Sequence, residues 1–250
     1  DDFAPYLYKT TDYGATWTKI TDGIAPTEFT RAIREARVRP GMLYAATERS
    51  MWLSYDAGTH WQSLARNLPP VPVHDIALRD DDIAIATHGR AFWVMENLTP
   101  LRYAPDVAAA GDKTFLYKPA PVFRTGGASA TVMYRLAQPN QTVTLDFLDG
   151  AGKLITKVAS TDTAPSAAGG RGGGGGGGRG GFGGPATVTT RAGVNTYAWN
   201  LRYPDASSFQ GMIFWAGGVQ GPTAPPGSYT VRLTVGSEKP ITQTLVVRRD

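Results

Sequence analysis

An eight-residue motif occurs twice in the chain, at a spacing of 44 residues. The stretch T-T-D-Y-G-A-T-W at residues 10–17 returns as S-Y-D-A-G-T-H-W at residues 54–61. A weaker echo follows, because A-A-T-E-R-S-M-W-L at 45–53 is matched by I-A-T-H-G-R-A-F-W at 85–93. Repeats of roughly 40 to 45 residues are typical of β-propeller blades, in which each repeat is one small sheet. The repeat therefore predicts stacked β-sheets for the N-terminal part of the chain.

The segments between the motifs have the two-residue alternation of β-strands. Residues 73–78 and 82–87 alternate in this way. Residues 30–37 resemble a short helix, but we predict a strand there, because Phe29, Arg31 and Ile33 alternate with small residues. These patterns predict about two and a half propeller blades over residues 1–100, which contain two of the motifs, followed by a linker at 101–120.

The C-terminal part has short apolar runs separated by turn signals. Six such runs predict the strands of an immunoglobulin-like β-sandwich over residues 121–250, at 130–137, 142–148, 153–159, 194–201, 228–235 and 241–248. The segment 169–184 interrupts them with 13 glycines in 16 residues. Such a composition cannot build a core, so we expect a mobile loop between two strands. The predicted fold class is all-β throughout.

Composition excludes several classes of site. The chain has no cysteine, and its three histidines (His60, His74 and His88) have no paired spacing, so we expect no metal and no cofactor. No run approaches the roughly 18 apolar residues of a membrane span. The segment 169–184 resembles RNA-binding RGG sequences, but its two arginines and one phenylalanine are too few for phosphate binding. We expect no nucleic-acid partner.

Each motif contains an aspartate, a glycine and a tryptophan that could serve chemistry or scaffolding. These residues are Asp12, Gly14 and Trp17 in the first copy and Asp56, Gly58 and Trp61 in the second. Glycoside hydrolysis needs two carboxylates roughly 5 to 10 Å apart across one bond, whereas one aspartate per repeat does not converge on a point. Asp can instead bond to backbone N–H groups of its own turn, Gly can adopt positive φ, and Trp can wedge between sheets. We therefore assign the motifs a structural role and predict no catalytic residue.

The motifs resemble the Asp-boxes of BNR-repeat propellers, a superfamily that includes sialidases and the sortilin propeller. Residues 36–95 are similar to the final blades of large bacterial secreted sortilin-like proteins. Residues 197–204, 211–218 and 221–229 resemble the C-terminal immunoglobulin-like domain of the same family. The resemblance implies an extracytoplasmic location, periplasmic or secreted. It also implies many more blades than this chain has, so we expect a processed or truncated C-terminal piece.

A propeller ring needs roughly four to eight blades, so the predicted blades leave an open edge. We expect a protein partner to cover this edge. The predicted function is a non-enzymatic structural or protein-interaction module, an accessory subunit of a larger assembly that can itself be attached to a membrane. One alternative is the remnant of a sialidase-like, glycan-acting hydrolase whose catalytic blades are missing. A second alternative is a carbohydrate-binding module.

Further polar and aromatic residues are candidates for contacts. The dense set Arg31, Arg34, Arg37 and Arg39 could bind a substrate carboxylate, but strand alternation sends these side chains to two faces, so we favour a solvated strand. We expect Arg90 to pair with a carboxylate among residues 80–82. The aromatics of the C-terminal part should mostly fill the sandwich core, with Tyr229 as a corner tyrosine. The candidate interface residues are Phe209, Phe214 and Trp215.

Overall fold

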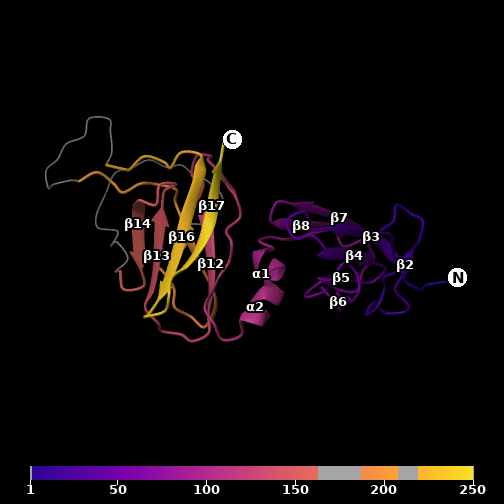
Figure 1. The fold of residues 1–250 in the computed structure, drawn as a ribbon. Helices are drawn as coiled ribbons and strands as arrows, with labels where there is room; N and C mark the ends of the chain where they lie inside the picture. Colours follow the sequence, from indigo (N-terminus) through magenta and orange to yellow (C-terminus); the bar gives the residue numbers. More distant parts are fainter. Residues whose placement is uncertain (1, 163–186, 208–218, 250) are drawn as a thin grey trace. The chain divides into compact units, whose positions relative to one another are not determined.

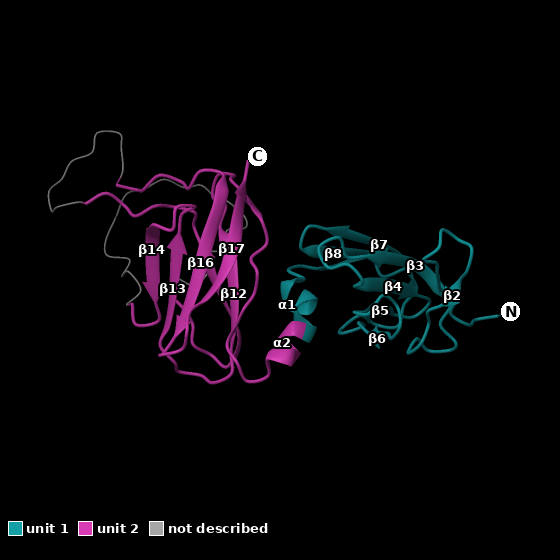
Figure 2. Cartoon of the chain, viewed as in Figure 1, with its two compact units in different colours: residues 1–105 teal, residues 106–250 magenta. Residues whose placement is uncertain are grey.

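The computed structural model describes residues 2–162, 187–207 and 219–249 of the chain (Figure 1). It confirms an all-β fold, in which the described strands form five sheets and none of these sheets is closed on itself. The chain divides into two compact units, residues 1–105 and 106–250 (Figure 2). The glycine-rich segment 169–184 and the candidate interface residues Phe209, Phe214 and Trp215 lie outside the described residues.

Unit 1 contains three successive sheets. The first pairs β1 (Tyr8–Lys9) with β2 (Thr18–Lys19). The second has the order β3 (Thr30–Glu35), β4 (Leu43–Thr47), β5 (Met51–Ser54) and β6 (Gln62–Ser63), and the third has the order β7 (Val73–Arg79), β8 (Asp82–Thr87) and β9 (Phe92–Met95). All pairs are antiparallel. The predicted strand at 30–37 is confirmed as β3.

The second and third sheets are built alike. The pairing of β3 with β4 shifts register just after Thr30, and the pairing of β7 with β8 shifts just after Val73. The turn between β4 and β5 and the turn between β8 and β9 are also closed in the same way. In each, a threonine hydroxyl, that of Thr47 or Thr87, donates to a backbone carbonyl across the turn. Strands β3, β4 and β5 are therefore the counterparts of β7, β8 and β9.

After β9 the chain turns into the short helix α1 (Thr99–Arg102). Asp81 holds this helix on unit 1. Its carbonyl accepts from Leu98 N (2.6 Å), and its carboxylate accepts from Thr99 Oγ1 (2.7 Å) and pairs with Arg102. The expected pairing of Arg90 with a carboxylate among residues 80–82 is thus wrong for Asp81, because the guanidinium that reaches it comes from α1.

Along the chain, the boundary between the two units falls within helix α2 (Ala104–Ala110), between Pro105 and Asp106. The range 101–120, predicted as a linker, contains this helix and also β10 (Phe115–Leu116). Strand β10 pairs with β12 (Ala130–Leu136) of unit 2.

Unit 2 consists of two sheets around one core. One has the order β10, β12 (Ala130–Leu136) and β15 (Gly193–Trp199). The other has the order β11 (Val122–Phe123), β17 (Ile241–Arg248), β16 (Gly227–Val235), β13 (Val143–Leu148) and β14 (Leu154–Ala159). Strand β11 runs parallel to β17, and the other pairs are antiparallel. All six runs predicted as strands are confirmed.

Three aromatic residues join the two sheets of unit 2. Phe147 of β13 stacks on Trp199 of β15 with ring centroids 4.7 Å apart. Tyr229 of β16 meets Trp199 edge-on at 5.7 Å. All three are buried in one hydrophobic cluster with aliphatic residues of both sheets. Aromatic pairs in these geometries add to the stabilisation by burial, so the predicted core role of Trp199 and Tyr229 is confirmed.

The corner role predicted for Tyr229 is also confirmed, because its hydroxyl donates to the carbonyl of Pro225 (2.6 Å). We predict that Tyr229→Phe lowers the stability of unit 2 by about 1 kcal/mol, the usual net value of one buried hydrogen bond. Amide hydrogen exchange in β16 and β17 measures this loss. Tyr13→Phe is the control, because Tyr13 is fully exposed. Equal exchange rates in Tyr229→Phe and the parent protein would contradict the assignment.

Candidate functional site

The first Asp-Gly-Trp motif forms the turn between β1 and β2. The Asp12 carboxylate accepts hydrogen bonds from the Thr16 backbone N–H (2.9 Å), the Thr16 hydroxyl (2.6 Å) and the Thr10 hydroxyl (2.8 Å). The Thr10 oxygen in turn accepts from Gly14 N (2.8 Å). Both carboxylate oxygens are thus used to close the turn, as expected of a turn aspartate.

The second motif forms the same turn between β5 and β6. The Asp56 carboxylate accepts from the Ser54 hydroxyl (2.8 Å) and the His60 backbone N–H (2.9 Å), and it meets His60 Nδ1 at 2.6 Å. Ser54 Oγ accepts from Gly58 N (2.9 Å). Ser54 therefore replaces Thr10, and the imidazole of His60 replaces the hydroxyl of Thr16.

The backbone of the two turns is also the same. Tyr13 and Gly14 have φ of 57° and 95°, and Ala57 and Gly58 have φ of 58° and 90°. Two consecutive residues in the left-handed region cost free energy, least at glycine. The hydrogen bonds of the aspartate offset this cost.

These hydrogen bonds stabilise the ionised form of both carboxylates. The Thr16 hydroxyl and N–H and the Thr10 hydroxyl lower the pKa of Asp12 to about 2. Burial opposes ionisation of Asp56, but the bonds from His60 and Ser54 outweigh it and lower the pKa of Asp56 to about 2 as well. Asp56, by its hydrogen bond and its charge, raises the pKa of His60, and the Asp22 carboxylate, 3.9 Å away, adds to this effect.

The tryptophans of the two motifs have different surroundings. Trp61 is 5% exposed and packs with Ile24 and Ala45. Its backbone N–H donates to Asp22 O and its indole N–H donates to Ile20 O, each over 2.8 Å. Trp17 is 60% exposed, and its indole N–H donates to Gly14 O of its own turn (3.1 Å). Trp61 thus joins its sheet to the preceding one, whereas Trp17 faces solvent.

The segment that receives Trp61 is the turn at residues 20–24, which directly follows β2. It fits the second motif closely, since a Cβ added to Gly58 would lie 2.5 Å from Ile20 Cδ1. Sequence reasoning missed this receiving turn. A signal was present, because the 44-residue spacing continues beyond the motif and relates Ile20 to Leu64 and Ile24 to Leu68.

The arginine set of β3 and the following turn does not converge on one site. Arg31 pairs with Glu48, and Arg34 pairs with Asp75. Arg39 donates to the carbonyl of Arg102 over 2.8 Å. These local partners fit the predicted solvated strand and do not form an anion site.

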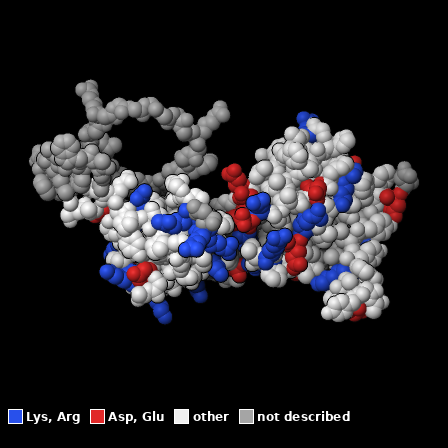
Figure 3. All heavy atoms as spheres, turned by 90° about the horizontal axis from the view of Figure 1, so that it is seen from above, with Lys and Arg blue, Asp and Glu red and all other residues white. Residues whose placement is uncertain are grey.

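The chemistry of the two motifs is that of a scaffold. All the bonds of Asp12 and Asp56 described above stay within their own turns. In the part of the chain that the structure describes, no group of three or more His, Asp or Glu residues could hold a metal ion. The face shown in Figure 3 carries side chains of both signs, and Lys and Arg are gathered more densely over part of it.

Comparisons with known proteins do not assign a family. A scan against family models finds no match, and a search of curated proteins finds none either. Among solved structures, the chain is similar to CopC from Methylosinus trichosporium OB3b, with 13% identity and a TM-score of 0.27 over 55% of this chain and 95% of that one. Separately, none of the described helices is long and apolar enough to cross a membrane.

Two glycine substitutions distinguish the free energy of backbone strain in the turn from that of packing on the receiving turn at residues 20–24. We predict that Gly14→Ala destabilises its turn by about 1 to 2 kcal/mol, because alanine is strained at φ 95° but meets only a Trp17 ring atom at 3.8 Å. Gly58→Ala carries the same strain and also collides with Ile20, which adds about 1 to 3 kcal/mol. Amide exchange in β1 and β5 measures the two losses. Equal losses would show that the second motif is not packed on the receiving turn.

The depressed pKa values predict how the turns respond to pH. A carboxyl group with a lowered folded-state pKa stabilises the fold above its unfolded pKa, and this contribution is lost as pH falls through the folded value. We predict that NMR signals of both aspartates titrate near pH 2 and that the turns loosen between about pH 4 and pH 2. His60→Ala should raise the pKa of Asp56 and leave that of Asp12 unchanged. Titration of both groups near pH 4 would contradict the hydrogen-bonded turns.

Proposed function

We propose that this protein is a non-enzymatic structural and protein-interaction module that serves as an accessory subunit of a larger assembly. In this proposal unit 1 consists of terminal propeller blades of the sortilin-like BNR type, and unit 2 is an immunoglobulin-like sandwich. The corner hydrogen bond of Tyr229 supports the assignment of unit 2. The repeated sheets and turns of unit 1 support the assignment of blades.

The observation that carries the proposal is the different exposure of two equivalent tryptophans. Trp61 is 5% exposed and Trp17 is 60% exposed, although the aspartates of their turns make corresponding hydrogen bonds and the φ angles are nearly the same. The fully exposed ring of Tyr13 lies on the same turn as Trp17. Exposed aromatic side chains are typical of protein interfaces. The first turn is thus a docking surface for a partner.

The chain itself indicates the chemistry of this partner. Trp61 binds to a turn that offers two backbone carbonyls and aliphatic side chains, at Asp22, Ile20 and Ile24. We propose that Trp17 binds a turn of the same kind in a partner protein, extracytoplasmic like the secreted proteins that the motifs resemble. The Asp12 carboxylate is not a catalytic group in this proposal, since its oxygens hold the turn.

A substitution at Trp17 tests the proposal. We predict that Trp17→Ala leaves the unfolding midpoint nearly unchanged, because the side chain is largely exposed, but releases the protein from its native assembly. Trp61→Ala should instead destabilise unit 1 by about 3 to 5 kcal/mol, as expected for a buried tryptophan. Size-exclusion chromatography of extracts from the source cells, with unfolding curves of the purified variants, measures both effects. An assembly that survives Trp17→Ala would contradict the docking role.

An activity assay tests the non-enzymatic assignment separately. We expect no turnover of aryl sialosides or other aryl glycosides by the protein. Turnover that disappears in Asp12→Asn or Asp56→Asn would overturn the assignment, because it would give the turn carboxylates a chemical role. Asp75→Asn serves as the control, because Asp75 lies on β7 and pairs with Arg34.

A further inference from the structure

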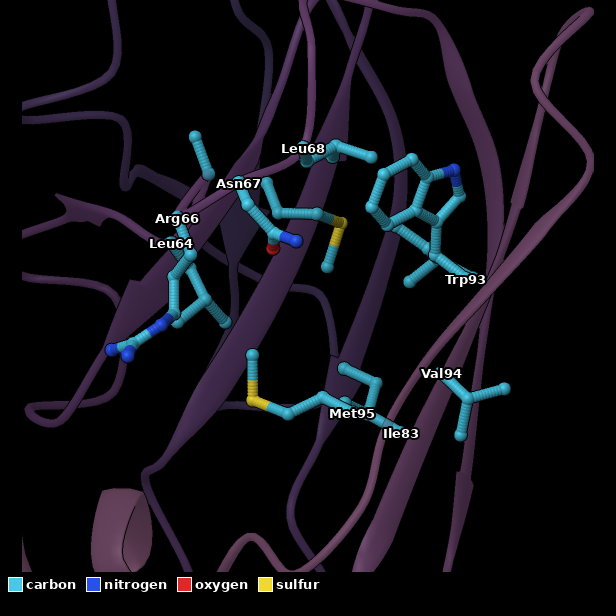
Figure 4. A pocket seen from close by; sticks show the side chains of 11 residues that line it. Leu64, Arg66, Asn67, Leu68, Ile83, Trp93, Val94 and Met95 are labelled. Atoms are coloured by element: carbon cyan, nitrogen blue, oxygen red, sulfur yellow. The ribbon is translucent and has the colours of Figure 1, made fainter.

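Unit 1 contains an apolar hollow beside β9. This hollow lies among residues of β5, β8, β9 and the segment that follows β6. In Figure 4, Leu64 and Asn67 lie on one side of this space and Trp93 on the other, with Leu68 above and Ile83 and Met95 below. Its lining is mainly aliphatic and aromatic, and such hollows in proteins are binding-site candidates.

The walls of this hollow are the counterparts of the walls around Trp61. Leu7, Leu43 and Trp52 pack on the cluster of Ile24, Ala45 and Trp61, and Ile20 bonds to the same indole. The 44-residue spacing relates three of these neighbours to residues of the hollow, and strand register relates the other three. By spacing, Leu7, Ile20 and Ile24 correspond to Met51, Leu64 and Leu68. By strand register, Leu43, Ala45 and Trp52 correspond to Ile83, Ile85 and Trp93.

The backbone of the two receiving turns is closed in the same way. Ile20 N donates to Leu7 O (2.9 Å), and Leu64 N donates to Met51 O (2.8 Å). Ile24 N donates to Thr21 O (3.1 Å), and the counterpart bond joins Leu68 N to Ala65 O (2.7 Å). The turns differ in backbone conformation, because the positive φ lies at Gly23 (94°) in the first and at Arg66 (48°) in the second. The match between the two sites therefore lies in their side-chain walls. Around residues 20–24 these walls enclose the side chain of a tryptophan.

A strand position is open next to the same hollow. Strand β6, which follows Trp61, pairs with β5 at Trp52 and Leu53. The counterparts on β9 are Trp93 and Val94, and β9 is an edge strand among the described residues. After β9 the chain bonds to Asp81 through Leu98 and enters α1. It therefore supplies neither a third turn of the Asp-Gly-Trp type nor a fourth strand there.

We propose that a partner polypeptide adds an antiparallel strand to β9 and places a tryptophan side chain in the hollow at 64–68. Backbone pairing along an open edge provides the affinity, and the pocket for one side chain provides the specificity. A second copy of this chain fits less well. Its Trp61 is already buried, and the strand that follows its exposed Trp17 already pairs with β1. The proposal does not depend on the docking role of Trp17, since it concerns other residues.

A peptide of this chain's own sequence is a suitable probe. Residues 54–64, S-Y-D-A-G-T-H-W-Q-S-L, carry Trp61 and the strand that follows it. We expect the peptide, titrated into the full chain, to shift NMR signals of the methyl groups at Leu64, Leu68, Ile83 and Ile85 and to protect amides of β9 from exchange. The same peptide with Trp61→Ala should bind at least about tenfold more weakly, as for loss of a central aromatic anchor.

Two variants of β9 give a matched pair on the protein side. Met95→Lys puts a charge into the wall of the hollow and should weaken binding at least about tenfold. Phe92→Lys changes a residue of the same strand that is 79% exposed and does not line the hollow, and it should retain affinity within about twofold. Since Met95 is partly buried, an amide spectrum establishes first that Met95→Lys is folded.

The outcomes are distinct. Binding that depends on the peptide tryptophan and on Met95 supports the proposal. Equal binding of the tryptophan and alanine peptides, or shifts away from β9 and the turn at 64–68, would overturn it, as would no shift at millimolar peptide. Sedimentation that shows self-association abolished by Met95→Lys but not by Phe92→Lys would assign the hollow to a second copy and also reject a separate partner. Trp17→Ala does not alter any of these measurements if the two surfaces are independent.

Discussion

The contact between the first two sheets of unit 1 depends on Trp61, which packs on the turn that follows β2. The Asp56 carboxylate makes its hydrogen bonds within its own hairpin, so these bonds fix the turn but do not join it to a neighbouring sheet. The contact to the preceding sheet comes from the indole N–H, the backbone N–H and the apolar ring of Trp61 together. Stability in such a chain is approximately a sum over repeats and over junctions between nearest neighbours. A repeat without a neighbour leaves the apolar surface of its contact exposed, and this surface then does not stabilise the fold.

The two aspartates stabilise their own turns, whereas Trp61 makes the contact to the preceding sheet. A carboxylate that accepts two or three hydrogen bonds from its own turn is held in its ionised form, and the lowered pKa values of Asp12 and Asp56 result from this. Perturbed titration often indicates an active site. Here the donors that lower the pKa are hydroxyl, imidazole and backbone groups of the turn itself. The lowered pKa therefore results from the hydrogen bonds that hold the turn in its conformation.

Much of the fold could be predicted from the sequence because its signals are local. The spacing of Asp, Gly and Trp, the alternation in β7 and β8 and the six strand runs of unit 2 are each visible within a few residues. The receiving turn at 20–24 could not be recognised by itself, because its partner Trp61 lies some forty residues away and its own residues are ordinary. The pairing of Asp81 with Arg102 was missed for a similar reason, since it depends on how α1 folds back on β8. The hollow at 64–68 became visible only when the walls around Trp61 were known.

The left-handed backbone at Tyr13 has a consequence for how the first turn is used. Glycine or asparagine adopts this conformation more readily than a bulky aromatic residue, and the second turn has the much smaller Ala57 at the same place. A tyrosine held there in full solvent exposure lowers the stability of the free chain and buries no surface of its own. The first turn thus combines a conformational cost with a fully exposed aromatic ring, whereas the second turn has only the methyl group of Ala57 in that conformation.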